Sequence, residues 1–339
     1  MRHRSFDLHT HHYTPEFFQA VRESRGDYSF TKDPTGRDII TLRGARFFGV
    51  TPAMTDLAAR LDAMDAAGID VAVLSLSTPN VFFLGAEAQP ALARRMNDAY
   101  AQAVADHPGR LRGFASIPMD DPDAALAELH RAMEELRLSG VILLSNIGGR
   151  ALTDARYRPF FAEADRMSVC ILLHPMIPAT GHEELREFVL GPIVAFPFDT
   201  TLAVARMCYA GMFRSYPRIR WIIAHAGGAI PWLMERLDSG YRDFAENRTH
   251  IDEPPSAYLK RLYYDTVTFS PHNLMMLRDL VGTDHMVMGS DFPHLLGAID
   301  RAIPSITSLP IPDAEKDRVL GGTALSILAN IDPPVPIMN

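Results

Sequence analysis

The hydrophobic positions of this chain alternate between two patterns. Short runs of apolar and β-branched residues have the length and composition of buried strands. Most of the longer segments between them carry apolar residues three and four positions apart, which is the spacing of an amphipathic helix. The strand-like runs are Phe6–His9, Asp70–Leu76, Leu111–Ile117, Gly140–Ser145, Val169–His174, Ile219–His225, Leu262–Val267 and Met286–Ser290. The helical patterns are clearest over Met54–Ala67, Pro90–His107, Pro122–Leu138, Tyr157–Arg166, Thr200–Phe213 and Ser270–Val281.

Strands that alternate with helices indicate an α/β fold with a parallel sheet. An open, doubly wound sheet and a closed (β/α)8 TIM barrel share this pattern. His9 and His11 stand at the end of the first run and Asp291 follows the last one, and only a closed barrel brings the first and eighth strands together. The sequence therefore predicts a single barrel domain over residues 1–339.

Three segments do not fit the simple repeat. Residues 13–53, rich in aromatic and charged side chains, are too long for an ordinary connection, so we expect a lid or insertion on the top face, where the strands end. Residues 175–199, rich in Pro and Phe, form a second long connection on the same face. Residues 304–339 end in a proline cluster and are expected to form a helix and an extended packing arm.

Composition and charge narrow the range of partners. With 47% hydrophobic residues the chain can bury a large core, and its formal net charge of −8 argues against a nucleic-acid or anionic-membrane surface. We expect no membrane helix, because no apolar run reaches the required length. Cys170 and Cys208 are the only cysteines, so we expect no disulfide and a cytoplasmic protein.

Metal-type ligands stand where several of the strand-like runs end. His9 and His11 are two residues apart, so on an extended strand both imidazoles face the same side. His174 and Asp291 each close a further run. A single histidine at a strand end is usually structural, but together these residues supply three imidazoles and a carboxylate, as in a catalytic zinc-type site. A bound water would complete the shell and ionise near neutral pH.

His225 ends another run and is followed by Ala226-Gly227-Gly228, which lets the backbone turn tightly beside the site. A neutral imidazole next to a metal-bound water can accept a proton, so His225 is the candidate acid/base. A fifth metal ligand and a structural histidine are the alternative roles.

Together these motifs resemble a known family. The residues that carry the resemblance are Asp7-Leu8-His9-Thr10-His11, His174-Pro175, Ala224-His225-Ala226-Gly227-Gly228 and Gly289-Ser290-Asp291-Phe292-Pro293. They are similar to the amidohydrolase-related metal-dependent decarboxylases, whose prototype is aminocarboxymuconate semialdehyde decarboxylase. Ile142–Asn146 and Pro197–Thr201 resemble the 6-methylsalicylate decarboxylase branch. The resemblance runs in order from Phe6 to Ile331.

The resemblance implies zinc bound by the four ligands His9, His11, His174 and Asp291, with His225 as acid/base. It also implies an arginine that binds the substrate carboxylate, which falls on Arg46, with Arg43 as a rival. A further arginine, Arg236, would reach the site of the neighbouring subunit in a homodimer. Binuclear hydrolytic relatives often carry a carboxylated lysine at the fourth strand end. Leu143–Asn146 contains no lysine, so one metal ion is expected.

We therefore expect one divalent ion per subunit, zinc with manganese as the alternative. The expected reaction removes CO2 from an aromatic or muconate-like carboxylic acid, with metal-bound water, His225 or Asp291 moving the proton. Metal-dependent hydrolysis of a C–C, ester, lactone or amide bond is the alternative, because the same residues serve both reactions. Asn146, Phe292 and His294 stand at or just past strand ends and are expected to contact the substrate. The expected partners are a small carboxylate substrate and a second copy of the chain, with no nucleic acid and no membrane.

Overall fold

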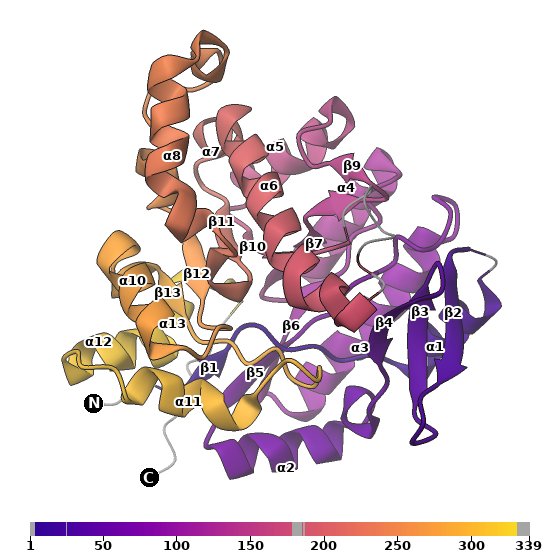
Figure 1. Cartoon of the computed structure of the whole chain (residues 1–339). Coiled ribbons are helices and arrows are strands. Elements are labelled where there is room, and N and C mark those ends of the chain that lie inside the picture. Colours follow the sequence, from indigo (N-terminus) through magenta and orange to yellow (C-terminus); the bar gives the residue numbers. More distant parts are fainter. Residues whose placement is uncertain (1–3, 25, 178–184, 186, 331–339) are drawn as a thin grey trace.

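The computed structural model describes residues 4–24, 26–177, 185 and 187–330. Its central sheet has eight parallel strands in the order β1-β5-β6-β7-β10-β11-β12-β13 (Figure 1). The last strand returns to the first, because the Leu8 N–H donates to the Met288 carbonyl (2.9 Å) and Thr10 bridges Phe292 in parallel. The (β/α)8 barrel and its eight expected strands are confirmed. The strands are β1 (Phe6–Asp7), β5 (Val71–Leu74), β6 (Leu111–Ala115), β7 (Gly140–Leu144), β10 (Cys170–His174), β11 (Arg220–Ile223), β12 (Tyr263–Asp265) and β13 (Met286–Val287).

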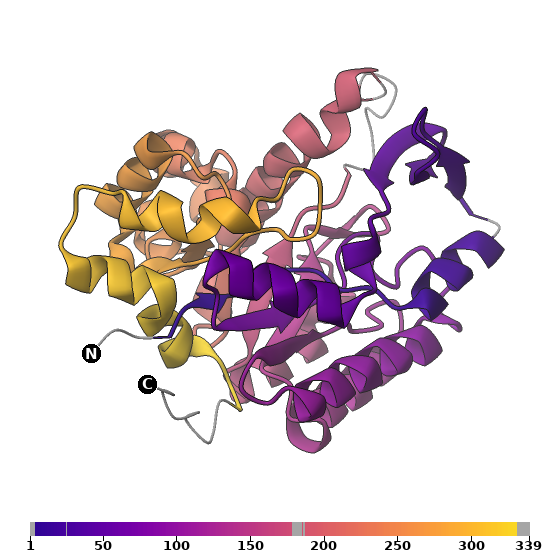
Figure 2. The same cartoon turned by 90° about the horizontal axis from the view of Figure 1, so that it is seen from below.

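Helices surround the barrel, as the two views of the chain show (Figures 1 and 2). Asp56 and Asp121 are the N-cap residues of α2 and α4. Their carboxylates accept hydrogen bonds from backbone N–H groups in the first turn of each helix. The pattern over Pro122–Leu138 divides into α4 and a π-helical turn at Arg131–Glu135. The helices of the ring are α2 (Leu57–Ala67), α3 (Gln89–Asp106), α4 (Pro122–His130), α5 (Arg158–Arg166), α6 (Phe196–Tyr209), α7 (Met212–Ser215), α8 (Ile230–Asp243), α9 (Pro255–Leu259) and α10 (Pro271–Val281).

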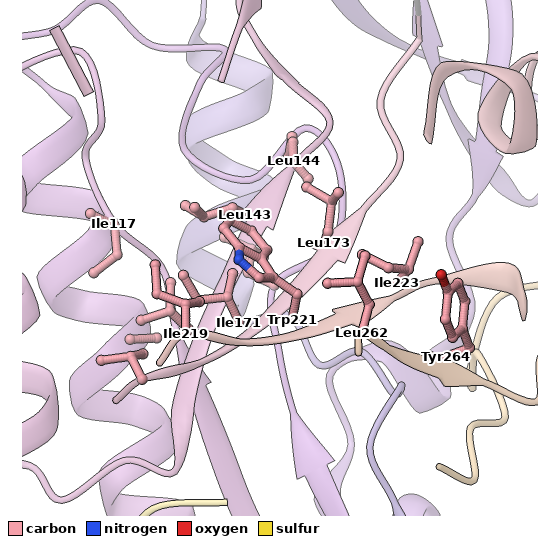
Figure 3. Close-up of a cluster of buried hydrophobic side chains, with 14 of the residues drawn as sticks. Ile117, Leu143, Leu144, Ile171, Leu173, Ile219, Trp221, Ile223, Leu262 and Tyr264 are labelled. Atoms are coloured by element: carbon pink, nitrogen blue, oxygen red, sulfur yellow. The ribbon is translucent and has the colours of Figure 1, made fainter. Parts of the chain in front are cut away.

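The core has two layers because alternate residues of each strand face opposite sides of the sheet. On β5, Val71 and Val73 belong to the barrel interior, whereas Ala72 and Leu74 pack in the outer layer against the helices. Figure 3 shows part of the outer layer, where apolar side chains of β7, β10 and β11 gather around Trp221. Apolar side chains of every barrel strand except β12 fill this interior layer.

The insertion after β1 is a small folded unit. It contains α1 (Pro15–Glu23) and a three-stranded antiparallel sheet of β2 (Tyr28–Lys32), β3 (Asp38–Leu42) and β4 (Ala45–Gly49). The β3–β4 turn uses Arg43 and Gly44 with φ of 50° and 78°, the left-handed conformations that a two-residue hairpin turn requires. Figure 1 shows β4 beside the segment that leads into α6. The sequence predicted an insertion here but not its strands.

The segment after β13 is more helical than expected. It forms α11 (Ile299–Thr307), α12 (Asp313–Asp317) and α13 (Thr323–Ile327). Ala324 and Ile327 of α13 join the interior layer and close the bottom of the barrel. The proline cluster of the expected packing arm lies outside the described residues.

One helical stretch has the length and composition of a membrane helix, which the sequence analysis did not anticipate. Glu187–Tyr209, which includes α6, is long and apolar enough by length and composition to cross a membrane, with a mean hydropathy of 1.7 over its most apolar part. The stretch is not a continuous apolar run, because Asp199 and Arg206 interrupt it. One face of α6 packs on the barrel through Val204 and Met207, whereas Phe198 and Leu202 on another face are 59% and 56% exposed.

Candidate metal centre and active site

Four ligand groups converge at the C-terminal ends of β1, β10 and β13. Ring nitrogens of His9, His11 and His174 and a carboxylate oxygen of Asp291 lie within 4.8 Å of one another, and all four residues are buried. Nε2 of His9 is 3.1 Å from Nε2 of His11, and Asp291 Oδ1 is 3.5 Å from the first and 3.2 Å from the second. The metal-binding site expected from the sequence is present.

The other ring nitrogen of each imidazole is held by a polar group of the barrel. The Nδ1 contacts are His9 to Asp265 Oδ2 (2.5 Å), His11 to Ser75 Oγ (3.0 Å) and His174 to the Pro175 carbonyl (2.9 Å). These contacts fix the rings through Nδ1, so Nε2 is the nitrogen that each ring can offer to an ion. Asp291 Oδ1 is buried and has no hydrogen-bond partner among the described residues. An unpaired carboxylate oxygen facing imidazole nitrogens fits a divalent cation.

The protonation states of the site also suit a metal. Burial lowers the pKa of His11 to about 3 and that of His174 well below its usual value, so both rings are neutral near pH 7. Burial alone would raise the pKa of Asp291, but the neighbouring imidazoles of His11, His225 and His9 hold it well below its usual value. Neutral imidazoles and an ionised carboxylate are the forms that bind a metal ion.

Close backbone approaches bring these groups together. Asp291 and His225 both have left-handed backbone, with φ of 56° and 55°. A Cβ on Gly289 would lie 2.9 Å from the His9 Cβ, so only glycine lets the end of β13 pack this closely on β1. A Cβ on Gly228 would lie 2.3 Å from the Pro197 carbonyl oxygen, and one on Gly227 would lie 2.7 Å from the Tyr264 ring, which explains the glycine pair after His225.

His225 stands beside the ligand cluster but is not one of its four members. Its Nε2 lies 3.6 Å from Asp291 Oδ2, and its side chain is 17% exposed. Its backbone N–H donates to Asp265 Oδ2 (3.0 Å), the oxygen that also holds His9. The backbone of His225 is therefore held next to the cluster, and its imidazole is accessible from the space above it.

That space is a cavity of about 680 Å³. His174, His225 and Asp291 form one end of it, and Arg46 and His294 also line it. Most of the other lining side chains are aromatic or aliphatic: Phe47, Phe48, Val189, Pro192, Ile193, Phe196, Pro197, Val267, Phe269, Leu295 and Leu296. A cavity of this kind accommodates a flat organic molecule with few polar groups.

The two candidate arginines of the insertion lie apart. Arg46, on β4, lines the cavity, whereas Arg43, in the hairpin turn, is exposed and pairs with Asp27 (2.7 Å). Arg236, on α8, is exposed at the surface and does not line the cavity.

Two expected substrate contacts lie elsewhere. The Asn146 amide group donates to the Ile177 carbonyl (3.2 Å) and to Asp199 (2.9 Å), because the chain folds back after β7. The Phe292 ring stacks with the Arg60 guanidinium, 5.0 Å from the ring centre, because the left-handed conformation of Asp291 turns the following residue aside. Neither residue is part of the cavity lining.

Other residues of the site were not assigned these roles from the sequence. Asp265 ends β12, which was a usable signal, but its partnership with His9 spans 256 positions. Arg60 is fully buried and donates to Thr10 Oγ1 (2.9 Å) and to the His11 carbonyl. Nothing in the sequence of α2 indicates that Arg60 would bind the backbone of the metal-ligand segment.

Comparisons with known proteins agree with this geometry. The amidohydrolase family model matches residues 6–329. The chain is 28% identical to a 2-amino-3-carboxymuconate-6-semialdehyde decarboxylase of Dictyostelium discoideum, over 98% of this chain and 93% of that protein. It is 30% identical to a gamma-resorcylate decarboxylase of Rhodococcus jostii, over 80% of this chain and 87% of that protein.

Among solved structures, a dihydroxybenzoic acid decarboxylase from Polaromonas, with bound manganese and the inhibitor 2-nitroresorcinol, superimposes with a TM-score of 0.80. It is 26% identical, over 96% of this chain and 97% of that one. The family resemblance inferred from the motifs is confirmed. The family model matches nearly the whole chain, and the barrel and the ligand cluster agree with that match. The chain therefore belongs to the amidohydrolase family.

Proposed function

We propose that this protein is a metal-dependent carboxy-lyase that removes CO2 from an aromatic or muconate-like carboxylic acid. The observation that carries the proposal is the cavity, which combines the ligand cluster and His225 at one end with Arg46 on walls that are mostly apolar. An apolar space with one guanidinium suits a planar organic acid. The decarboxylases to which the chain is similar support this reaction.

Different residues of the cavity bind the substrate and transfer the proton. Arg46 binds the substrate carboxylate through two parallel hydrogen bonds, and the apolar walls exclude water. His225, beside Asp291, delivers a proton to the carbon that carries the carboxylate. A C–H bond forms there, the C–C bond breaks, its electron pair returns to the π system, and CO2 leaves. A divalent ion on the four ligands supplies electrostatic stabilisation of the negative charge on a substrate oxygen.

We propose one zinc ion per subunit, because three imidazoles and a carboxylate are a ligand set that zinc favours. Manganese is the alternative, and the Polaromonas relative contains it. We also propose a cytoplasmic location, in keeping with the two free, buried cysteines.

The direct test is CO2 release from hydroxybenzoates and muconates by protein loaded with Zn²⁺ or Mn²⁺. Arg46→Ala should lower kcat/KM by about ten-fold to a hundred-fold, the value of a charge-assisted hydrogen bond. Arg43→Ala is the matched control, because Arg43 lies three positions away and pairs with Asp27 outside the cavity. Release of an alcohol or amine without CO2 would replace the lyase with the hydrolase alternative.

We further propose a homodimer that buries the outer faces of α6 and α8. Phe198, Leu202 and Trp232 expose 59%, 56% and 79% of their surface there, and the two helices contact each other. Exposed large apolar side chains on adjoining helices are typical of an interface. Arg236 follows Trp232 by one helical turn, so it lies on the same face of α8. A partner seated on this face would receive Arg236.

Mixing two impaired variants tests this assembly. If Arg236 acts in the partner's site and Arg46 in its own, heterodimers of Arg46→Ala and Arg236→Ala contain one site with both arginines. Their activity should therefore rise well above that of either variant alone. Arg242→Ala, on the same helix but paired with Glu235, is the control. A fully active monomer, or no recovery after verified subunit exchange, would refute the proposal.

A further inference from the structure

Arg60 of α2 is a fully buried cation without a paired carboxylate. Its surface is 0% exposed, and no Asp or Glu oxygen of the described residues lies within ion-pair distance of its guanidinium. A buried charge without a counter-charge is costly, so hydrogen bonds to neutral groups must offset the hydration that it loses. The groups that bind this guanidinium therefore indicate what the arginine does.

These groups belong to the two strand ends that carry metal ligands. Nη1 donates to Thr10 Oγ1 (2.9 Å), and Nη2 donates to the His11 carbonyl. The face of the guanidinium lies over the Phe292 ring, 5.0 Å from its centre. Thr10 separates His9 from His11, and Phe292 directly follows Asp291. One side chain therefore contacts three of the four ligands or their neighbours in sequence.

The histidine pair has little other support on this side. β1 ends at Asp7, so both histidines lie beyond the regular hydrogen-bond ladder. The His11 N–H donates to the Phe292 carbonyl (2.7 Å), but the His11 carbonyl has no donor other than Arg60 among the described residues. Without the guanidinium, the peptide after His11 loses the bond that sets its orientation, and the ring becomes free to turn.

We propose that Arg60 is a positioning residue for the metal centre, which fixes the histidine pair after β1 against the carboxylate that follows β13. The inference goes beyond the proposed reaction, because it concerns the ligand cluster and holds whichever substrate the site accepts. The positive charge of Arg60 also repels a divalent ion. Its hydrogen bonds and its charge therefore act on metal affinity in opposite directions, which lets an experiment separate them.

The experiment measures the affinity of metal-free protein for Zn²⁺ by competition with a chelator. Arg60→Met keeps a long side chain but removes every donor. Its affinity for Zn²⁺ should fall about ten-fold to a hundred-fold, the loss expected when a partner that orients a ligand is removed. Arg60→Lys keeps the charge but not the fork of the guanidinium, so its affinity should lie between those of Arg60→Met and the parent protein.

Arg112→Met is the matched control. Arg112 is only 8% exposed and also donates to backbone carbonyls, those of Pro108 (2.5 Å) and Leu111 (2.7 Å). These carbonyls lie at the start of β6, at the end of the barrel opposite the ligand cluster. The affinity of Arg112→Met for Zn²⁺ should equal that of the parent protein, whatever its thermal stability.

Cobalt provides a second readout, because the visible absorption of bound Co²⁺ depends on the geometry of its ligands. Arg60→Met should change this spectrum, Arg60→Lys should change it less, and Arg112→Met should leave it as in the parent protein. A residue that only packs α2 on the barrel would alter thermal stability without altering the spectrum.

Unchanged or tighter Zn²⁺ binding by folded Arg60→Met would overturn the proposal, because Arg60 would then be a packing residue or a repelling charge. An equal loss in Arg112→Met would also overturn it, since the loss would then reflect general destabilisation. If Arg60→Met does not fold, Arg60→Lys decides the question, and parent-like affinity there would refute the role. CO2 release by the unaltered protein tests the reaction alone, so the two proposals can fail separately.

Discussion

The carboxylate of Asp265 is the group on which the geometry of the site depends most. It is fully buried and accepts four hydrogen bonds. Oδ2 accepts from His9 Nδ1 (2.5 Å) and from the His225 backbone N–H (3.0 Å). Oδ1 accepts from the backbone N–H groups of Ala226 (2.8 Å) and Val267 (3.0 Å). One side chain thus orients a metal ligand and the turn that carries the proposed acid/base.

Asp265→Asn keeps the shape of this side chain but replaces one oxygen with a donor. Whichever oxygen is replaced, two N–H donors then face an NH2 group and lose their acceptor. Each buried donor left unpaired costs about 1–3 kcal/mol, so the unfolding free energy should fall by about 2–6 kcal/mol. Metal affinity should fall about ten-fold to a hundred-fold, because the substitution releases the His9 ring from its orientation.

The assay combines thermal unfolding of metal-free protein with competition for Zn²⁺ against a chelator. Asp199→Asn is the matched control, since Asp199 is also a buried carboxylate but accepts from Ser145 and Asn146, away from the ligand cluster. It should destabilise the fold and leave metal affinity unchanged. Unchanged metal affinity in Asp265→Asn, or an equal loss in both variants, would refute the role of Asp265 in orienting His9.

Three further predictions follow from the same geometry. His174→Ala should lose most of its bound metal, measured by elemental analysis, while its circular dichroism stays that of the parent protein. His225→Asn should retain the metal but lose about two to four orders of magnitude in kcat, with His272→Asn as the control; loss of the ion would make His225 a ligand. Burial and the charge of Arg60 lower the pKa of His12 to about 3 in the folded protein, from 6.5 in the unfolded chain. The unfolded chain therefore binds a proton first as the pH falls below 6.5, and the folded state loses stability from that pH downward. His12→Gln should therefore reduce the slope of unfolding free energy against pH by about 1.4 kcal/mol per unit between pH 6 and pH 4, measured by chemical denaturation of metal-free protein.

The barrel and its ligand cluster could be predicted because both depend on short-range signals. A parallel strand buried on both faces is a continuous apolar run, and Cys170–His174 is such a run with its ligand at the end. The antiparallel strands of the insertion share no single burial pattern, because β3 is buried at four of its five positions and β2 at none. Tyr28–Lys32, for example, has no buried residue and therefore no clear alternation.

The direction of individual side chains could not be predicted from strand ends. Phe292 follows a ligand directly, yet the positive φ of Asp291 sends its ring to Arg60. The polar partners of the ligands were equally hidden, because Asp265 and Ser75 meet His9 and His11 only through the closed barrel. Sequence patterns report which residues end strands, whereas tertiary packing decides what those residues touch.

The seam where β13 meets β1 has a consequence for biosynthesis. Ser290 bonds Asp7 through its backbone N–H (3.0 Å) and its hydroxyl (2.5 Å), across 283 positions of sequence. His9 and His11 therefore leave the ribosome early, but their carboxylate partner Asp291 arrives only when most of the chain has been made. Contacts this distant in sequence form late, since the intervening chain must first be ordered. A nascent or truncated chain that ends before β13 carries the histidine pair without the group that completes the cluster, so competence to hold the ion coincides with completion of the barrel.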